Sequence, residues 1–203
     1  MVPDDPQIFH ITHRSNLASI VEQGGLWCDS KRIARNLKTT NIGHLHIKER
    51  RLKRAVPTSG GGHLGDYVPF NFCPRSVMLF VVDRGHQDYT AGQADIVHLV
   101  SSVSRAATAD HAWAFTDRHA ELQHALYYED LAELGEVSWG VMGETYWSAV
   151  KEERQAEFLV KEFFPWSLFT EIGVMSQAVQ KAVRQALAGA DAPPVTIHRD
   201  WYS

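Results

Sequence analysis

One glutamate stands out in the sequence as a candidate for chemistry. Glu157 lies at the start of a mainly apolar segment, and only Gln155 and Ala156 separate it from the charged run 151–154. Alternate residues of an extended strand face opposite sides, so Glu157, Leu159 and Lys161 share one face. A carboxylate beside an apolar core must stay hydrated, find a partner or shift its pKa. Glu157 is therefore a candidate catalytic residue. The alternative is that it is simply the last polar residue before a buried strand.

The basic residues are concentrated in one segment. Of the 20 Lys and Arg residues in the chain, nine lie between residues 31 and 54, where Glu49 is the only acid. The whole chain has a net charge of −4, so the remainder is strongly acidic. A single basic segment in an acidic protein favours a local polyanion site over a nonspecific nucleic-acid coat. A solvated basic helix is the alternative.

The other reactive side chains form no familiar catalytic or metal motif. The sequence lacks GxSxG, GxxxxGK[ST] and HExxH patterns. The pair His44 and His46 has no third ligand at a recognisable spacing, so we expect no metal. Cys28 and Cys73 are isolated, which predicts buried thiols in a reducing compartment and a cytoplasmic protein. The glycines at 60–62 indicate a hinge, with a phosphate-binding loop as the alternative.

Length and composition indicate an ordinary globular chain. The 203 residues are 44% hydrophobic and 22% charged. No apolar run approaches the roughly 20 residues that span a bilayer, and the N-terminus lacks a signal-peptide pattern. We therefore expect a single domain over residues 1–203 and no membrane partner.

Hydrophobic periodicity predicts the elements that must position these residues. Strands are predicted at 8–12, 26–28, 66–74, 76–82, 96–100, 113–116, 156–164, 172–175 and 195–198. Helices are predicted at about 15–23, 117–134 and 176–187, with partly helical structure in the basic segment. Two prolines place 66–74 near a sheet edge or bulge, whereas the apolar run 76–82 is predicted to be a central strand. Because the strands do not alternate with helices, the class is α+β with a mixed or antiparallel sheet.

Short blocks spread over the whole chain carry a further signal. They are Phe9-His10-Ile11-Thr12-His13 with Asn16-Leu17, Glu49-Arg50-Arg51, Asp66-Tyr67-Val68-Pro69-Phe70, Pro74-Arg75-Ser76 with Met78-Leu79, Phe115-Thr116-Asp117-Arg118-His119, Gln155-Ala156-Glu157-Phe158-Leu159-Val160 and Asp200-Trp201-Tyr202. In this order and with these gaps, they resemble the DarT family of DNA ADP-ribosyltransferases. The match is weakest at about 30–46 and 138–154.

This resemblance implies an ADP-ribosyltransferase-like fold in which flanking helices surround a split mixed or antiparallel sheet. It implies NAD as co-substrate, and transfer of ADP-ribose to a base of single-stranded DNA, most often thymidine. It also implies that the protein is the toxin of a pair whose antitoxin is a macrodomain. Guanine in DNA, RNA and protein are alternative acceptors, and a non-catalytic nucleic-acid-binding module is a further alternative.

The resemblance also implies roles for individual residues. Glu157 matches the catalytic glutamate, and Arg51 matches an arginine proposed to help activate the base. The residues implied in NAD binding are Arg51, His10, Ile11, Thr12, Ser19 and Trp27. A segment at about 30–56 is expected to cover NAD, and one at about 119–157 is expected to present the substrate. Because a guanidinium stays protonated in proteins, its chemistry favours an electrostatic role for Arg51 over that of a base.

Five residues are candidates for contact with DNA: Arg75, Met78, His119, Tyr146 and Trp147. Arg75 and Met78 are included because they lie in matching blocks. The rings of His119, Tyr146 and Trp147 could stack on unpaired bases. The alternative for Tyr146 and Trp147 is that they pack a long loop onto the core.

Overall fold

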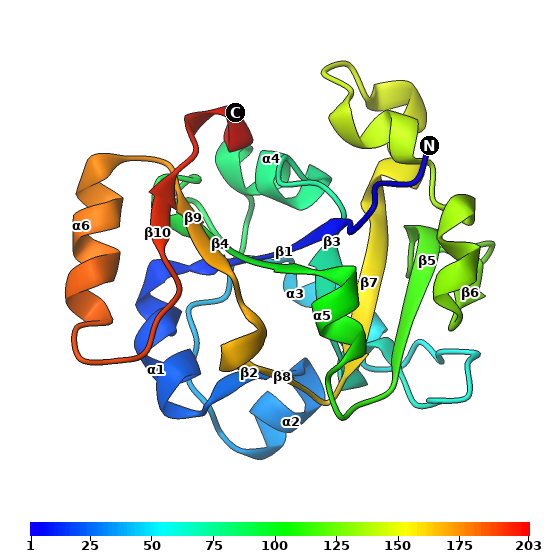
Figure 1. Cartoon of the computed structure of the whole chain (residues 1–203), viewed down its shortest axis with the longest axis horizontal. Helices are drawn as coiled ribbons and strands as arrows, with labels where there is room; N and C mark the ends of the chain where they lie inside the picture. The colour runs from blue at the N-terminus through cyan, green and yellow to red at the C-terminus, as the bar shows by residue number, and fades with distance from the viewer.

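A mixed sheet of eight strands runs through the centre of the protein (Figure 1). The structure is a computed structural model that describes residues 1–203. The strand order is β10-β9-β4-β1-β3-β7-β5-β6, and only β10 and β9 are parallel neighbours. The strands are β1 (Gln7–His13), β3 (Tyr67–Asn71), β4 (Ile96–Ser102), β5 (Trp113–His119), β6 (Tyr127–Tyr128), β7 (Ala156–Lys161), β9 (Glu171–Val174) and β10 (Val195–Ile197). A second, small sheet pairs β2 (Gly25–Trp27) with β8 (Phe163–Pro165). The α+β class and the mixed sheet expected from the sequence are confirmed.

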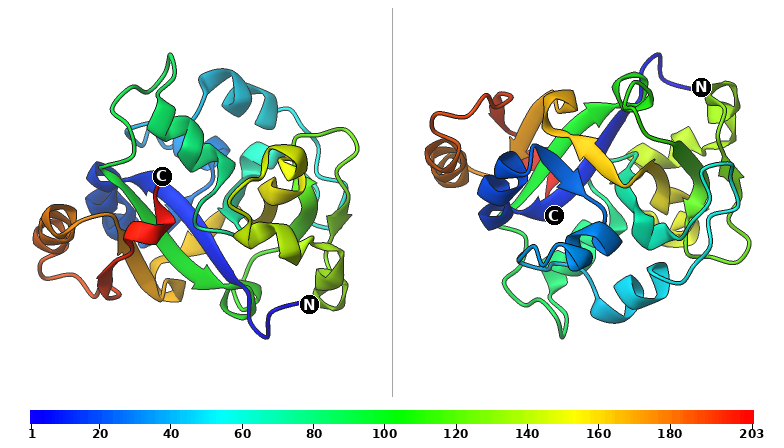
Figure 2. Two further views of the ribbon diagram at one scale, coloured as in Figure 1. Left: turned by 90° about the horizontal axis from the view of Figure 1, so that it is seen from above. Right: turned by 90° about the horizontal axis from the view of Figure 1, so that it is seen from below.

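Short helices flank these sheets. They are α1 (Leu17–Glu22), α2 (Asp29–Ala34), α3 (Leu45–Arg51), α4 (Val77–Arg84), α5 (Val103–Ala107) and α6 (Gln177–Ala186). Figure 1 and the two views of Figure 2 show α6 beside β10 at one edge of the molecule, with α1 next to it. None of the helices combines the length and the apolar character needed to cross a bilayer.

The large sheet is nearly divided at its middle. β1 pairs with β4 along its whole length, but it meets β3 at only one residue pair, Phe9 and Asn71. Beyond that pair, the strands separate and the His10 imidazole Nδ1 contacts the carbonyl oxygen of Pro69 at 2.9 Å. The nitrogen and carbonyl of a strand residue point to the same side, so the missing N–H of Pro69 also faces this opening. The split expected from the family resemblance is therefore present between β1 and β3.

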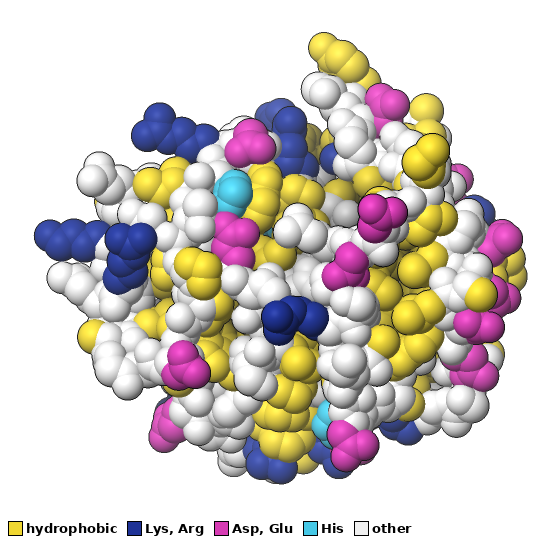
Figure 3. Space-filling view, in the orientation of Figure 1, with side chains coloured by type: hydrophobic (Ala, Val, Ile, Leu, Met, Phe, Trp, Pro, Cys, Tyr) yellow, Lys and Arg dark blue, Asp and Glu magenta, His cyan; other side chains and the backbone are white.

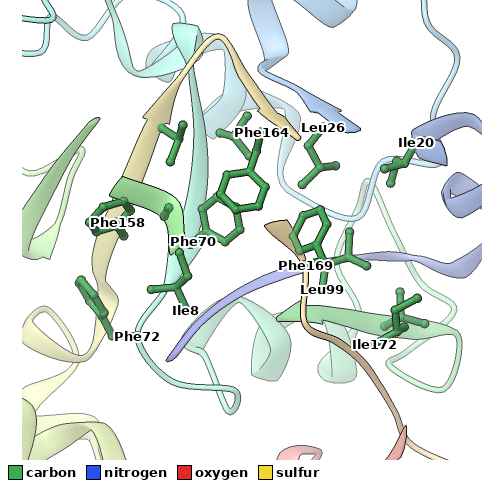
Figure 4. Close-up of a cluster of buried hydrophobic side chains, with 14 of the residues drawn as sticks. Ile8, Ile20, Leu26, Phe70, Phe72, Leu99, Phe158, Phe164, Phe169 and Ile172 are labelled. Atoms are coloured by element: carbon green, nitrogen blue, oxygen red, sulfur yellow. The ribbon is translucent and has the colours of Figure 1, made fainter. Parts of the chain in front are cut away.

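A large apolar cluster holds the two halves of the sheet together. It contains 26 buried residues, and Figure 4 shows several of its aromatic rings gathered between the strands. The ring centroids of Phe70 and Phe164 lie 4.7 Å apart, and those of Phe164 and Phe169 lie 4.9 Å apart. Burying a side chain of this size contributes roughly 1.5–3 kcal/mol. β3 and β7 are thus fixed by packing on one side and can carry polar residues on the other.

Charged side chains are unevenly placed on the face shown in Figure 3. Asp and Glu gather at the edge near β6, whereas Lys and Arg are scattered, with several at the opposite edge near α6. This face therefore presents no continuous basic surface.

The predicted central strand at 76–82 is wrong, because this apolar run forms helix α4. The Ser76 hydroxyl caps the helix by accepting a hydrogen bond from the backbone N–H of Leu79 at 3.1 Å. Leu79 and Val82, three positions apart, are buried, while Met78 is 37% exposed. A run of apolar residues does not by itself distinguish a buried strand from a helix that packs on one side and faces a cavity on the other.

The helix predicted at 117–134 is also wrong. β5 continues to His119, and Tyr127 and Tyr128 return as the short strand β6. The Asp117 carboxylate accepts a hydrogen bond from the backbone N–H of Leu126 at 2.9 Å, which closes the loop between the strands. The rings of Phe115 and Tyr128 stack with centroids 5.1 Å apart. Cross-strand pairing therefore outweighs the helical spacing of the apolar residues here.

Smaller differences concern the strands around Glu157. The segment predicted near a sheet edge forms β3, which lies inside the sheet between β1 and β7. The single strand predicted at 156–164 is interrupted at Glu162, whose φ of 63° turns the chain from β7 into β8. The predicted elements at 8–12, 15–23, 26–28, 96–100, 113–116, 172–175, 176–187 and 195–198 are present, with ends that differ by a few residues.

Candidate active site

Glu157 and Arg51 form a two-pronged ion pair at the opening of the sheet. Arg51 Nη1 donates to Glu157 Oε1 at 3.0 Å, and Arg51 Nη2 donates to Glu157 Oε2 at 2.8 Å. The two side chains are only 13% and 7% exposed. Paired hydrogen bonds of this kind fix the relative orientation of a guanidinium and a carboxylate. The structure thus brings together two candidate residues that lie 106 positions apart in the sequence.

Two different elements bring these residues together. Arg51 is the last residue of α3, and Glu157 is the second residue of β7. The backbone N–H of Glu157 donates to the Thr116 hydroxyl of β5 at 3.0 Å. As the alternation predicts, Phe158 and Val160 point into the large apolar cluster, while Leu159 packs in a separate small cluster on the side of Glu157. The Glu157 carboxylate therefore projects from a strand whose opposite face packs into the large apolar cluster.

The protein keeps Glu157 ionised although it is buried. Burial by itself raises the pKa of Glu157. The opposing effects are larger, so the net pKa is lowered: they are the charge of Arg51, the nearby His119, and hydrogen bonds from Arg51 and the Ala120 N–H. Burial lowers the pKa of Arg51, yet its attraction to Glu157 raises the net value. Both shifts favour the charged forms. At neutral pH the site holds a carboxylate and a guanidinium.

His119 adds a neutral imidazole beside the ion pair. Its Nε2 lies 3.9 Å from Glu157 Oε1, and its side chain is 23% exposed. Burial lowers the pKa of His119, and Arg51 lowers it further, while Glu157 partly opposes the change. The unprotonated ring can accept a proton, which a guanidinium cannot do.

A cleft of about 450 Å³ opens above the pair, a size common for small-molecule sites. The structure brings nine of the twelve candidate site residues to its walls. These are His10, Ile11, Thr12, Ser19, Trp27, Arg51, Met78, His119 and Glu157. The basic segment forms one wall, through residues of α2, α3 and the loop between them.

Trp27 provides an unused hydrogen-bond donor in this cleft. Its ring packs against Phe163 with centroids 4.4 Å apart, and the Arg35 guanidinium lies 3.7 Å from the ring centroid. The buried indole Nε1 has no hydrogen-bond partner. A buried donor without a partner costs free energy. A ligand atom that accepted a hydrogen bond from this indole N–H would remove that cost.

Sequence reasoning missed several polar residues of the cleft. Asp29 accepts hydrogen bonds from Arg32 and Lys48, each at 3.2 Å, and Asn16 bonds to Thr12 at 3.0 Å. Burial raises the pKa of Asp29, but the charges of Lys48 and Arg32 lower the net value. Lys48 could have been found from its spacing, since it precedes Arg51 by one helical turn. Asp29 gave no signal because only folding places it against the cations.

The other three DNA candidates lie outside the cleft lining. Arg75 and Tyr146 are exposed, Tyr146 to 92%. Trp147 meets Phe80 of α4 edge-to-face, with ring centroids 5.4 Å apart. Met78 lines the cleft from α4, so the structure places it on a helix and not on the strand that was predicted.

Two other candidates from the sequence do not contribute to this site. Burial raises the pKa of Cys73 to about 11, which argues against a thiolate nucleophile. Gly60, Gly61 and Gly62 do not line the cleft. The Gly61 carbonyl instead accepts a hydrogen bond from the Tyr67 hydroxyl at 2.7 Å.

Known proteins resemble this chain along its whole length. A protein of Thermus aquaticus described as a DNA ADP-ribosyl transferase is 42% identical over 198 residues, which cover 96% of this chain and 88% of the relative. A relative of the same description from Escherichia coli O127:H6 is 32% identical over 192 residues, covering 91% of this chain and 87% of the relative.

Solved structures also match the fold of this chain over its whole length. DarT of Thermus sp. 2.9 in complex with ADP-ribosylated ssDNA is 41% identical, with a TM-score of 0.94 and coverage of 100% of this chain and 99% of that chain. The same protein in complex with NAD+ gives a TM-score of 0.88 at 38% identity, with full coverage of both chains (100% and 100%). The family model described as "ssDNA thymidine ADP-ribosyltransferase, DarT" matches residues 9–203. This chain therefore belongs to the DarT family.

Proposed function

We propose that this protein transfers ADP-ribose from NAD+ to a base of single-stranded DNA and releases nicotinamide. The observation that carries the proposal is the buried Arg51–Glu157 pair in a cleft large enough for a nucleotide ligand. The Thermus sp. 2.9 relatives bound to NAD+ and to ADP-ribosylated ssDNA, with the same fold, support both substrates. The family description supports thymidine as the acceptor.

Glu157 is the catalytic carboxylate in this proposal. Breaking the bond between nicotinamide and ribose creates positive charge at the ribose carbon, which an ionised carboxylate nearby stabilises. Three N–H groups already donate to Glu157, two from Arg51 and one from Ala120. A carboxylate has about four acceptor positions. One position is thus left for a ribose hydroxyl without loss of the ion pair.

Arg51 acts through its charge. Its guanidinium holds Glu157 in one orientation and keeps it ionised inside the cleft. The same charge would favour a deprotonated base or a phosphate close by. Neutral His119, 3.9 Å from Glu157, is the better acceptor for the proton that the base must lose.

NAD+ fits the polar and aromatic wall opposite this pair. His10, Thr12, Ser19 and Trp27 all face the cleft, and Trp27 offers its unpaired indole N–H. The basic segment at about 30–56 covers this ligand, and three of its cations, Arg32, Lys48 and Arg51, line the cleft, each paired with a carboxylate. DNA enters past Met78 and His119, with the segment at about 119–157 presenting it. Arg75, Tyr146 and Trp147 would contact nucleotides beyond the modified base.

The cellular setting follows the family. We propose a cytoplasmic toxin whose modification is removed by a macrodomain antitoxin. Thermosipho africanus DarTG in complex with ADP-ribose shares the fold, with a TM-score of 0.81 at 18% identity and coverage of 97% of this chain and 50% of that chain. Adding a macrodomain protein to modified DNA and measuring release of ADP-ribose would test the pairing.

Labelled NAD+ offered with single-stranded DNA, RNA and protein side by side tests the proposed substrate class. Label should appear on the DNA in a reaction that requires Glu157. Label on RNA or protein alone would contradict the proposal. Label on DNA that contains guanine but no thymidine would support ADP-ribose transfer to DNA. It would contradict thymidine as the modified base.

A further inference from the structure

Several histidines and one aspartate converge at the rim of the cleft, away from the Arg51–Glu157 pair. His44 is the residue before α3, and His46 lies in the first turn of that helix. Asp88 lies in the tight turn after α4, where His86 and Tyr89 form a bridge. The donor atoms of His44, His46 and Asp88 all lie within 4.8 Å of one another. The sequence alone showed only the two histidines, because folding supplies the aspartate from a distant loop.

The polar atoms of this cluster are incompletely paired. His44 Nδ1 is buried with no hydrogen-bond partner, and it lies 3.7 Å from Asp88 Oδ2. That oxygen accepts one hydrogen bond, from the backbone N–H of Leu45 at 3.1 Å. Buried polar groups are normally paired. An unpaired imidazole nitrogen facing a carboxylate oxygen leaves room for a cation between them.

The neighbouring His86 is oriented as a supporting or fourth ligand. Its Nε2 donates to the Ile42 carbonyl at 3.1 Å, so its Nδ1 carries the free lone pair. Nδ1 accepts a long hydrogen bond from the Asp88 N–H at 3.3 Å and lies 3.9 Å from Asp88 Oδ2. Histidines that bind metals commonly donate their other ring N–H to a backbone carbonyl in this way.

The imidazole rings of the cluster lie close together, so more than one of them can reach a single ion. The ring of His44 lies 3.9 Å from that of His86 and 5.1 Å from that of His46, measured between centroids. Neutral imidazole is the form that binds metals.

We propose that His44, His46 and Asp88 bind a divalent transition-metal ion of the zinc class, with His86 or water as the fourth ligand. Imidazole with one carboxylate suits zinc, cobalt or nickel better than magnesium or calcium. Zinc bonds of about 2.0–2.2 Å require these ligand atoms to move closer together. His46 is exposed and can make that movement.

The position of the site indicates a structural role. The ion would tie the start of α3 to the turn after α4, and α3 ends at Arg51. His44 and His86 both line the cleft, so the tie would fix the rim of the nucleotide site. We infer that the ion stabilises the fold and takes no part in the transfer reaction.

Titration of tag-free full-length protein with Zn²⁺ in a calorimeter tests this site, with Co²⁺ absorption as a second readout. The wild-type protein should bind one ion per chain, show the strong visible bands of tetrahedral Co²⁺, and melt at a higher temperature with Zn²⁺. His46→Ala and Asp88→Asn should remove all three effects.

His63→Ala is the matched control. His63 also faces a carboxylate, with Nδ1 3.7 Å from Asp66 Oδ2, and it is exposed like His46. Its removal should leave zinc binding unchanged. Circular dichroism of each variant without metal checks that the variants are folded. The proposal is overturned if wild type binds no Zn²⁺ below millimolar concentration, or if folded His46→Ala and Asp88→Asn bind it as wild type does.

Discussion

Replacing Arg51 by Gln should convert Glu157 from an ionised to a protonated side chain. Arg51 supplies two of the three hydrogen bonds to this carboxylate and the strongest force that lowers its pKa. Without it, burial remains as the largest influence and raises the pKa. Removing one partner of a buried pair typically costs about 3–5 kcal/mol of stability. The Arg51 and Glu157 side chains are only 13% and 7% exposed, so they form a buried pair of this kind.

The sign of the pH dependence should also reverse. In the wild-type protein the lowered pKa of Glu157 adds stability above the pKa of an unfolded glutamate. That contribution is lost as the pH falls through the folded pKa. In Arg51→Gln the folded pKa lies above the unfolded one, so stability should instead rise as Glu157 takes up its proton. Urea unfolding at several pH values, with NMR titration of isotope-labelled glutamate, measures both effects.

Arg50→Gln provides a matched control one residue away on the same helix. Arg50 pairs with Glu121, but its side chain is 57% exposed. Exposed pairs contribute little, so this variant should keep near wild-type stability and leave Glu157 ionised. If Arg51→Gln lost no more stability than Arg50→Gln and Glu157 stayed ionised, the argument that Arg51 controls the carboxylate would be refuted.

Three further changes test other parts of the structure. Tyr146→Ala should weaken binding of single-stranded DNA by about 1–3 kcal/mol without lowering the melting temperature, because the side chain is 92% exposed; unchanged affinity in a fluorescence titration would exclude base stacking there. Ser76→Ala should cost about 1 kcal/mol in urea unfolding, because it removes the cap that accepts the Leu79 N–H at 3.1 Å; no loss would mean that the cap is dispensable. Burial lowers the pKa of His98 from 6.5 to about 4, so stability should fall by about 3 kcal/mol as the pH drops through that range. An NMR titration of the His98 ring near pH 6.5 would contradict this assignment.

The sequence predicted the elements with clear alternation or clear caps, and it failed where tertiary contacts decide. The helix after Ser176 formed as expected, and the strand that begins at Ala156 formed but ends at Lys161. The run 77–82 was misassigned because an apolar segment that lines a cleft looks like a buried strand. The segment after Asp117 was misassigned because its apolar spacing suits a helix, whereas cross-strand contacts make it a hairpin.

The candidate site was predictable only in part for a related reason. Glu157 could be suspected from alternation, and the family resemblance supplied Arg51 and the first NAD-binding block. The contact between the two residues depends on how α3 packs across the sheet, which no local pattern encodes. Asp29 and Asp88 were invisible in the sequence because their partners lie far away in the chain. Local patterns identify residues with chemical potential, and folding determines which of them meet.

Mass spectrometry of defined single-stranded oligonucleotides after incubation with NAD+ tests the central claim most directly. One oligonucleotide should contain a single thymidine, and matched ones should carry guanine, cytosine or adenine in its place. Wild-type protein should add the mass of ADP-ribose to the thymidine, and Glu157→Gln should reduce the rate by a factor of about 10² or more. An unmodified thymidine oligonucleotide, or near wild-type transfer by Glu157→Gln, would contradict the account.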